Sequence, residues 1–418
     1  MVTVREFSTF FGGNLSLSDL PVELVSEIFL KLPVRSLLTC QCVCKSFDEL
    51  IRSPKFRASH VNHNSTSSTN TYCSLNILVI DEDSEKRREH ILIDTAGDVI
   101  STSHVRQSNP LTTPISVIGS CNGLFCAFLH VPAEQWGSRI MLWNPVTREN
   151  RYLPKPNIDA PDSQSYPLIV FGFVPESNES KVVRFNSYYT SGKILPLPDD
   201  VFVMQIEVYK MSTNSWTVLT SNAIPCNGPG HMSLENDSFL LLKFDPPSRT
   251  LFLKGAFHWL AVNPKNVWDS CAAVVAFDLK HEELKLISLL ESHRILYAKE
   301  GQLEIINDLL GLIVPCSTYS PNFEIWAMND YGKREPWTKQ FHVELSTWFV
   351  RPCGYWQDSF LLMGEFEGGR QKSLFLFNIH TQERQYILKS GSFFFEYFCS
   401  CVETLVPVSK GMQLLECR

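Results

Sequence analysis

The feature that most constrains this chain is a repeated unit: a strand-like run carrying an aromatic residue, a polar turn, and a second strand-like run. Five copies align, as MLWNPVTRENRYLP, IEVYKMSTNSWTVL, VAFDLKHEELKLISL, EIWAMNDYGKREPWTKQF and LFLFNIHTQERQYIL. The aromatic residues are Trp143, Tyr209, Phe277, Trp326 and Phe377, at intervals of 66, 68, 49 and 51 residues. Short runs rich in β-branched and aromatic residues and bounded by turn residues are typical of strands. We therefore expect a chain of repeated small sheets.

A glycine-bearing pair of strand-like runs precedes some of these units, as in SCNGLFCAF and LFLKGAFHWLAV. Four strands per unit at a period near 50 residues is the pattern of a β-propeller blade. The longer first intervals leave room for insertions such as the proline-rich TSGKILPLPDD. The sequence thus predicts a mainly β protein with a β-propeller-like domain over residues 72–418. A multi-sheet β-sandwich is the alternative, the blade count stays open, and only scraps such as LEIINDLL suit a helix.

The region near the N-terminus is different, because it predicts a small all-α module of three short amphipathic helices. Leu24 and Ile28 follow the spacing of one helix face. Pro21 suits the first turn of that helix, whereas Pro33 ends it and can begin the next. A third helix is expected before Pro54 ends it.

A polar run separates the two regions. Residues 60–71, HVNHNSTSSTNT, contain almost nothing apolar, so we assign residues 59–71 to a flexible linker. Three helices of about ten residues bury too little surface to stand comfortably alone. The module must therefore pack on the β region or present apolar side chains to a partner. The linker favours the second arrangement.

Composition and charge exclude several classes of function. The net charge is −7 and the one basic cluster, Lys86-Arg87-Arg88, has an acidic residue on each side, which argues against nucleic-acid binding. We expect no membrane segment and no signal peptide, because apolar runs of sufficient length are missing. The 13 cysteines are scattered without a C-x-x-C pair, as expected for reduced thiols in the cytoplasm and/or nucleus.

Candidate catalytic and metal-binding residues are weak. The run GSCNG, residues 119–123, is similar to a nucleophile elbow around Cys121, but that geometry needs a helix where LFCAFLH predicts a strand. A glycine-bearing hairpin fits better. Cys40, Cys42 and Cys44 are two residues apart, so on a helix they point in different directions and cannot share one zinc ion. We therefore expect no catalytic set, no metal and no cofactor.

The helical region closely resembles the F-box. The motifs that carry the resemblance are Leu20-Pro21, Glu23-Leu24, Ile28, Leu32-Pro33, Ser36-Leu37, Val43-Cys44-Lys45-Ser46, Leu50-Ile51, Pro54 and Phe56. The resemblance implies docking on a Skp-type adaptor, which itself sits on a cullin scaffold. The adaptor-binding residues that it implies are Leu20, Pro21, Leu24, Ile28, Leu32, Pro33, Leu37, Val43, Cys44, Phe47 and Leu50. Phe47 stands where the family usually has Trp, so weaker packing is expected there.

The β region is similar to the F-box-associated domain of plant F-box proteins, among them kelch-like and S-locus F-box members. The resemblance rests on GSCNGLFCAF, LWNPVTRENRYLP, FGFVP, VYKMSTNSWTVL, KGAFHWLAV and AFDLKHEEL, in this order. Together the two resemblances cover residues 18–405. They imply a three-helix F-box at 18–58, and a domain at 72–418 that captures a target protein for a Skp–cullin–F-box ubiquitin ligase. A non-degradative scaffold, a lectin-like binder and a propeller enzyme are the alternatives.

Overall fold

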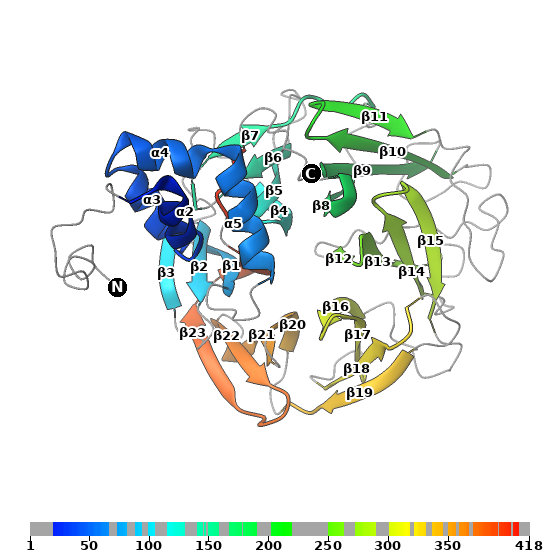
Figure 1. The fold of residues 1–418 in the computed structure, drawn as a ribbon. Coiled ribbons are helices and arrows are strands. Elements are labelled where there is room, and N and C mark those ends of the chain that lie inside the picture. Colours follow the sequence, from blue (N-terminus) through cyan, green and yellow to red (C-terminus); the bar gives the residue numbers. More distant parts are fainter. Residues whose placement is uncertain are drawn as a thin grey trace.

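The computed structural model describes residues 20–66, 73–81, 88–93, 99–104, 115–129, 140–144, 146–147, 149–158, 167–177, 179–189, 202–219, 250–262, 272–289, 301–317, 322–331, 337–345, 350–356, 359–367, 371–391, 393–402 and 404–408. Short helices come first and are followed by strands, so the predicted order of a small α module and a mainly β domain is confirmed (Figure 1).

The described helices are α2 (Val22–Leu30), α3 (Val34–Gln41), α4 (Lys45–Arg52) and α5 (Pro54–Thr66). Pro21 and Pro33 directly precede α2 and α3, with φ values of −52° and −58° that suit a helix entrance. The first three helices agree with the prediction. The fourth does not, because Pro54 begins α5 as well as following the end of α4.

Helix α5 corrects the predicted linker over residues 59–66, which are helical. His60 is 1% exposed, and its Nε2 lies 3.2 Å from the Leu32 carbonyl oxygen. Its ring also lies 6.0 Å from that of Phe56, so the face of α5 that carries both residues packs against the other helices. The sequence does not predict this contact, because the buried rings of Phe56 and His60 lie among polar residues. One buried ring per helical turn gives almost no hydrophobic periodicity. Residues 67–71 of the predicted linker lie outside the described residues.

Within the described ranges the strands form six four-stranded antiparallel sheets, which we call blades 1 to 6. Blade 1 holds β24 (Phe393–Val402), β1 (Cys73–Asp81), β2 (Arg88–Ile93) and β3 (Val99–His104). Blade 2 holds β4 (Ile115–Cys121), β5 (Leu124–Leu129), β6 (Ile140–Trp143) and β7 (Asn150–Tyr152). Blade 3 holds β8 (Leu168–Val174), β9 (Glu179–Tyr189), β10 (Phe202–Lys210) and β11 (Ser215–Leu219).

Blade 4 holds β12 (Leu251–Leu253), β13 (Ala256–Val262), β14 (Ala272–Asp278) and β15 (Glu283–Ser288). Blade 5 holds β16 (Gln302–Ile306), β17 (Leu309–Pro315), β18 (Phe323–Met328) and β19 (Trp337–Val343). Blade 6 holds β20 (Val350–Trp356), β21 (Ser359–Glu367), β22 (Gln371–Asn378) and β23 (Arg384–Gly391). Figure 1 shows the blades arranged around a common centre, as in a β-propeller.

The last described strand closes the propeller. Strand β24 pairs antiparallel with β1, from Cys73 opposite Val402 to Asp81 opposite Phe393. Blade 1 therefore combines the beginning and the end of the β domain. The two neighbours of β24 in the circle are β20 of blade 6 and β4 of blade 2.

The repeat register read from the sequence is confirmed. The five aromatic residues lie in β6, β10, β14, β18 and β22, which are the third strands of blades 2 to 6. Tyr209 and Phe277 are fully buried and Phe377 is 5% exposed, whereas Trp143 and Trp326 are only half-buried. The repeat thus marks equivalent strands, but not equally buried side chains.

Hairpin turns explain several of the polar residues between strands. Asn122 and Gly123 join β4 to β5 with φ values of 49° and 75°, so the predicted hairpin around Cys121 is confirmed. Asn307 and Asp308 join β16 to β17 with φ values of 49° and 60°. Two consecutive positive φ values are the signature of the type I′ turn that suits the twist of a hairpin. LEIINDLL, expected as a scrap of helix, is therefore a strand pair.

The core of the β domain lies between neighbouring blades. Phe185 of blade 3 packs against Trp259 and Phe277 of blade 4, at ring-centroid distances of 5.1 and 5.2 Å. Gly172 in β8 permits this approach, because a Cβ there would lie only 2.7 Å from the ring of Phe257. Blades 3 and 4 are thus joined by aromatic packing and by a glycine in FGFVP.

We predict that a chain ending at Gly391, without β24, loses cooperative unfolding in thermal circular dichroism. The truncation leaves a row of unpaired backbone groups along β1 and opens the circle of blades. A chain ending at Val408 is the matched control, because it keeps every described contact of β24. If the Gly391 chain melts as sharply as the control, closure by β24 is not needed for folding.

Candidate protein-interaction surfaces

The helical module has a core of its own. Phe29, Leu37, Phe47, Ile51 and Phe56 are each at most 7% exposed and form one apolar cluster. The rings of Phe29 and Phe47 meet edge to face with centroids 5.0 Å apart. Phe29 also meets Phe56 edge to face at 6.5 Å. Such pairs add about 0.5–1.5 kcal/mol each beyond burial, which helps a module of this size to hold together.

The predicted adaptor-binding residues divide into two groups. Leu37 and Phe47 are buried, so their role in the described structure is to hold the module together. Leu20, Ile28, Leu32, Pro33, Cys44 and Leu50 are half-buried. Pro21, Leu24 and Val43 are exposed.

Three exposed apolar side chains mark the surface of the module. Leu24 is 53% exposed and Val43 is 61% exposed. Val22, which was not predicted, is 56% exposed. It lies on the same helical stripe as the buried Val25 and Phe29, so periodicity alone assigns it to the core. Because these side chains are only a little more than half exposed, covering the rest of each would contribute roughly 1–2 kcal/mol.

The module also packs against the propeller, through residues 404–408, which we call the strap. Leu405 of the strap is 2% exposed and joins the apolar cluster of the module, with Val146 of blade 2 packed against it. Val406 and Val408 join the cluster between blades 2 and 3. The strap therefore lies between the module and the propeller, and the expectation of a loosely tethered module is corrected.

A buried asparagine in blade 2 holds the strap. The Asn144 side chain is fully buried, and its Nδ2 donates to the carbonyl oxygens of Thr404 (3.1 Å) and Val406 (2.9 Å). Its Oδ1 accepts from the backbone N–H groups of Val146 (3.0 Å) and Thr147 (3.2 Å). Both donors and both acceptor positions of the amide are used, as burial of such a group requires. The sequence WNPVTRE belongs to the repeated unit, but nothing in it predicts the contact between Asn144 and the strap.

A carboxylate in the same turn makes a second contact with the strap. Glu149 Oε2 accepts from the backbone N–H of Val408 at 3.0 Å. The same carboxylate lies close enough to α5 to affect Arg57. Burial lowers the pKa of Arg57, and the negative charge of Glu149 partly offsets this by raising it. Blade 2 thus contacts the strap by hydrogen bonds and the module by charge.

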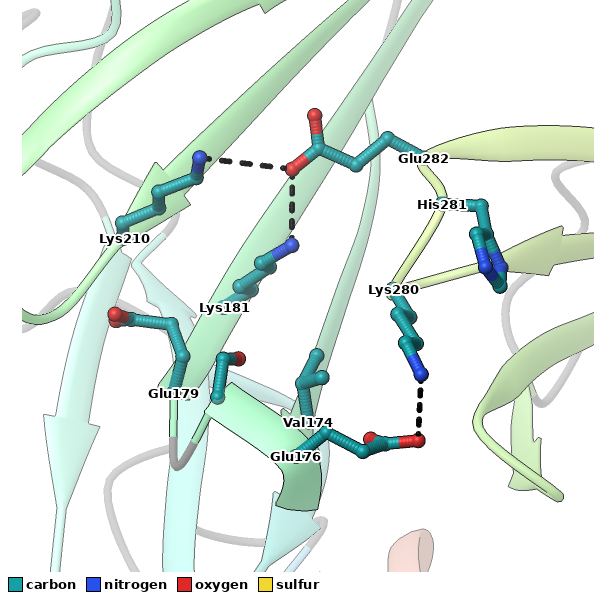
Figure 2. A pocket seen from close by; sticks show the side chains of 9 residues that line it. Val174, Glu176, Glu179, Lys181, Lys210, Lys280, His281 and Glu282 are labelled. Atoms are coloured by element: carbon teal, nitrogen blue, oxygen red, sulfur yellow. Dashed lines mark hydrogen bonds and ion pairs between the residues drawn. The ribbon is translucent and has the colours of Figure 1, made fainter. Parts of the chain in front are cut away.

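A charged pocket of about 490 Å³ lies at the junction of blades 3 and 4 (Figure 2). Lys181 is 7% exposed and its Nζ lies 2.9 Å from Glu282 Oε1, with the Leu279 carbonyl oxygen at the same distance. Lys210 Nζ approaches the same carboxylate oxygen at 3.8 Å. This side of the pocket is thus an ion-pair network joining the two blades.

The other side of the pocket is formed by an exposed ion pair. Lys280 Nζ and Glu176 Oε1 are 3.1 Å apart, and the two side chains are 50% and 59% exposed. The pair makes the rim both cationic and anionic, which suits a charged protein surface better than a small apolar ligand. His281 and Glu282, in the predicted turn, also line the pocket.

The geometry does not support the cysteine of GSCNG as a nucleophile. Burial raises the pKa of Cys121 to about 12, so its thiol stays protonated near neutral pH. A nucleophilic cysteine needs the opposite shift, because the thiolate is the reactive form.

Among the helices that the structure describes, none has the length and apolarity required to cross a membrane.

Comparison with known proteins agrees with this architecture. Residues 17–60 match the F-box-like family and residues 70–401 match the F-box associated beta propeller domain. The chain therefore belongs to the F-box proteins that carry an F-box associated β-propeller domain. The F-box domain implies binding to a Skp-type adaptor in general, and members of this family are typically non-catalytic.

Three of the similar proteins come from Arabidopsis thaliana. F-box protein CPR1 is 26% identical over 365 residues, which cover 82% of this chain and 78% of that protein. An F-box/kelch-repeat protein is 23% identical over 359 residues, covering 84% and 86%. A further F-box protein is 23% identical over 346 residues, covering 79% and 74%.

We predict that Asn144→Asp loosens the strap, because it replaces Nδ2, which donates to two carbonyl oxygens, with a carboxylate oxygen that can donate to neither. The free energy of unfolding should fall by about 3 kcal/mol or more, because the new carboxylate is buried without a donor. Hydrogen exchange at residues 404–408 should accelerate. Asn378→Asp is the matched control, since Asn378 makes the same turn in blade 6 through Oδ1 bonds to His380 and Thr381. Equal exchange at the strap in both variants would contradict this role of Asn144.

Proposed function

We propose that this chain is the substrate-recognition subunit of a Skp–cullin–F-box ubiquitin ligase. The F-box would bind a Skp-type adaptor and, through it, a cullin, and the propeller would hold a target protein. The observation that carries the proposal is the exposure of Leu24 and Val43 on a module whose own core is already filled. Apolar side chains of this size on a packed module favour a protein partner over solvent.

The contact between module and propeller supports a role in positioning. A receptor of this kind does no chemistry itself, because it contributes effective concentration by keeping a target lysine near a charged ubiquitin-conjugating enzyme. The strap and Asn144 fix the helical module against blade 2. A fixed module would hold the bound adaptor at a more constant position relative to the target than a flexibly linked module would.

The pocket at blades 3 and 4 is the surface that we assign to the target. Its rim pair, Lys280 and Glu176, is exposed and can exchange its partner for charges of opposite sign on a target. The deeper pair, Lys181 and Glu282, is mostly buried and already satisfied, so it would support the shape of the site. The target itself is expected to be a protein with acidic and basic side chains at its contact surface.

We predict that Leu24→Asp and Val43→Asp each weaken adaptor binding by about tenfold or more, because each places a charge where apolar surface would be covered. The measurement is the Kd of full-length protein for a purified Skp-type adaptor, by calorimetry. Val218→Asp is the matched control, since Val218 is 40% exposed on blade 3 and far along the chain from the F-box.

The melting temperature separates this effect from unfolding. Both surface variants should melt as the wild type does, whereas Leu37→Asp should destabilise the module because Leu37 is fully buried. Full adaptor affinity in Leu24→Asp and Val43→Asp would refute the assigned surface. Adaptor binding without cullin-dependent ubiquitination of a captured target would instead favour a non-degradative scaffold.

We predict that the double variant Glu176→Lys/Lys280→Glu loses target proteins while keeping the adaptor. The swap preserves an ion pair at the exposed rim, so the melting temperature should stay that of the wild type. The measurement compares proteins that co-purify with each form while proteasome activity is blocked, with the adaptor as internal standard. An unchanged set of co-purifying proteins would place target binding elsewhere on the propeller.

A further inference from the structure

Blade 5 carries a cluster of a cysteine, a glutamate and a histidine, away from the surfaces described above. Cys316 directly follows β17, Glu324 lies in β18 and His342 lies in β19. Glu324 pairs with His342 across one strand boundary and with Val314 across the other. Cys316 is two residues beyond Val314, so its side chain faces the same side of the sheet. Three adjacent strands therefore direct a thiol, a carboxylate and an imidazole to one place.

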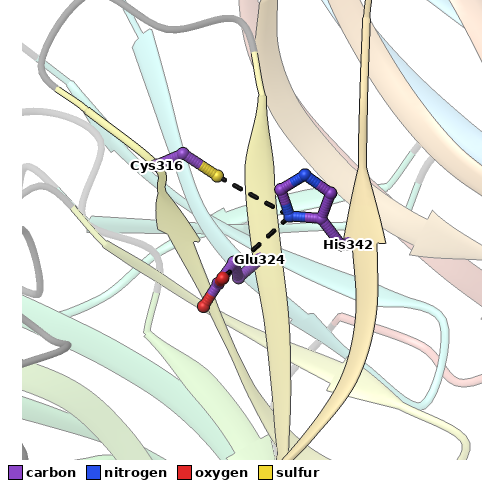
Figure 3. Close-up of side chains that lie close together, drawn as sticks. All are labelled: Cys316, Glu324 and His342. Carbon is purple, nitrogen blue, oxygen red and sulfur yellow. Dashed lines mark hydrogen bonds and ion pairs between the residues drawn. The ribbon is translucent and has the colours of Figure 1, made fainter.

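The distances within this cluster are close to those of a coordination site (Figure 3). His342 Nδ1 lies 3.9 Å from Cys316 Sγ and 4.0 Å from Glu324 Oε1. The ligand atoms of all three residues lie within 4.8 Å of one another. A tetrahedral zinc ion with ordinary bond lengths holds its N, O and S ligand atoms about 3.3–3.6 Å apart. Shifts of about 1 Å by exposed side chains would close the difference.

We propose that Cys316, Glu324 and His342 form a Zn²⁺ site on blade 5. Thiolate, imidazole and carboxylate are the three side-chain ligands that zinc takes in proteins. A sulfur ligand disfavours magnesium and calcium, which select oxygen. Three protein ligands leave one position of the tetrahedron for water, as in zinc sites that exchange their fourth ligand.

A second carboxylate fits the expected surroundings of such an ion. Glu344 Oε1 lies 3.3 Å from His342 Nε2, on the side of the imidazole away from Cys316 and Glu324. Zinc-binding histidines usually donate their other ring N–H to a carboxylate, which fixes the tautomer that leaves the first nitrogen free for the metal. His342 is arranged in this way, with Nδ1 toward the cluster and Nε2 toward Glu344.

A lysine ammonium lies against the Glu324 carboxylate of this cluster. Lys339 Nζ lies 2.6 Å from Glu324 Oε1. Trp326 Nε1 donates to the other carboxylate oxygen, Glu324 Oε2, at 3.2 Å, which holds the carboxylate in this orientation. Zinc must displace Lys339 from Oε1. Removing the lysine should therefore strengthen the binding of zinc.

A cysteine–histidine catalytic pair explains the cluster less well. The Glu324 carboxylate lies within 4.8 Å of the Cys316 thiol, and its negative charge disfavours the thiolate that a nucleophile requires. A bound divalent cation supplies the positive charge that makes a thiolate beside a carboxylate favourable.

The test is a metal titration of full-length protein that has been reduced and treated with a chelator. Cobalt(II) should produce sulfur-to-cobalt charge-transfer absorption, which one equivalent of Zn²⁺ removes. Cys316→Ser should abolish this absorption, and His342→Ala should weaken Zn²⁺ binding by more than about tenfold. Cys42→Ser is the matched control, because Cys42 is an exposed free thiol on the helical module and should not affect the spectrum.

A gain of affinity guards against misfolded variants. Lys339→Gln should bind Zn²⁺ more tightly than the wild type, by about three- to tenfold, an effect that unfolding cannot produce. Circular dichroism checks the fold of each variant. The proposal is overturned if the wild type shows no sulfur-to-cobalt absorption, if Cys316→Ser retains it, or if Lys339→Gln binds Zn²⁺ no more tightly.

Discussion

The pairing of β24 with β1 is the constraint on which the rest of the structure depends. Each of the other five blades is made from four strands that follow one another in the chain, and blade 1 alone joins distant segments. The backbone groups of β1 would otherwise form an unpaired edge, so its pairing with β24 completes blade 1 and closes the circle of blades. It also brings residues 404–408 to the side of blade 2, beside the helices. Ring closure and the position of the F-box are therefore linked.

The strap contacts both the propeller and the helical module, so it connects the two domains. Side chains of the strap point to both domains. Leu405 packs in the apolar cluster of the module, whereas Val406 and Val408 pack in the cluster of the propeller. Asn144 fixes the backbone between them by hydrogen bonds that are shielded from water. Leu405 adds to the apolar core that the helices of the module already form. The apolar side chains that stay exposed are then available for another protein.

Buried charged side chains in the propeller are paired with each other and hydrogen-bonded to the backbone. Arg184 and Glu207 form a 2.7 Å ion pair in blade 3, and both also bond the backbone of Ile158. Glu207 is fully buried, so this network must satisfy nearly all of its hydrogen-bonding capacity. Lys181 and Glu282 form the corresponding contact between blades 3 and 4. Such pairs contribute little net stability compared with apolar packing, but they tolerate few alternative arrangements of the strands.

The sequence by itself determined the class of the fold, because period and composition are local properties. The aromatic residues at Tyr209, Phe277 and their equivalents marked the third strand of five blades, and the prolines marked the starts of α2 and α3. The F-box pattern also identified the residues of the helical module. It could not separate Leu37, which is buried, from Leu24, which is exposed, since both are leucines on amphipathic helices.

Only the tertiary structure decided the contacts between segments far apart in the chain. It showed that β24 completes blade 1, that His60 and α5 occupy the predicted linker, and that Asn144 reaches the strap 260 positions later. The cluster of Cys316, Glu324 and His342 was hidden for the same reason. A pattern along the chain reports which face a side chain takes on its own strand or helix. What that face meets depends on the register between strands and on closure of the whole domain, which no local spacing encodes.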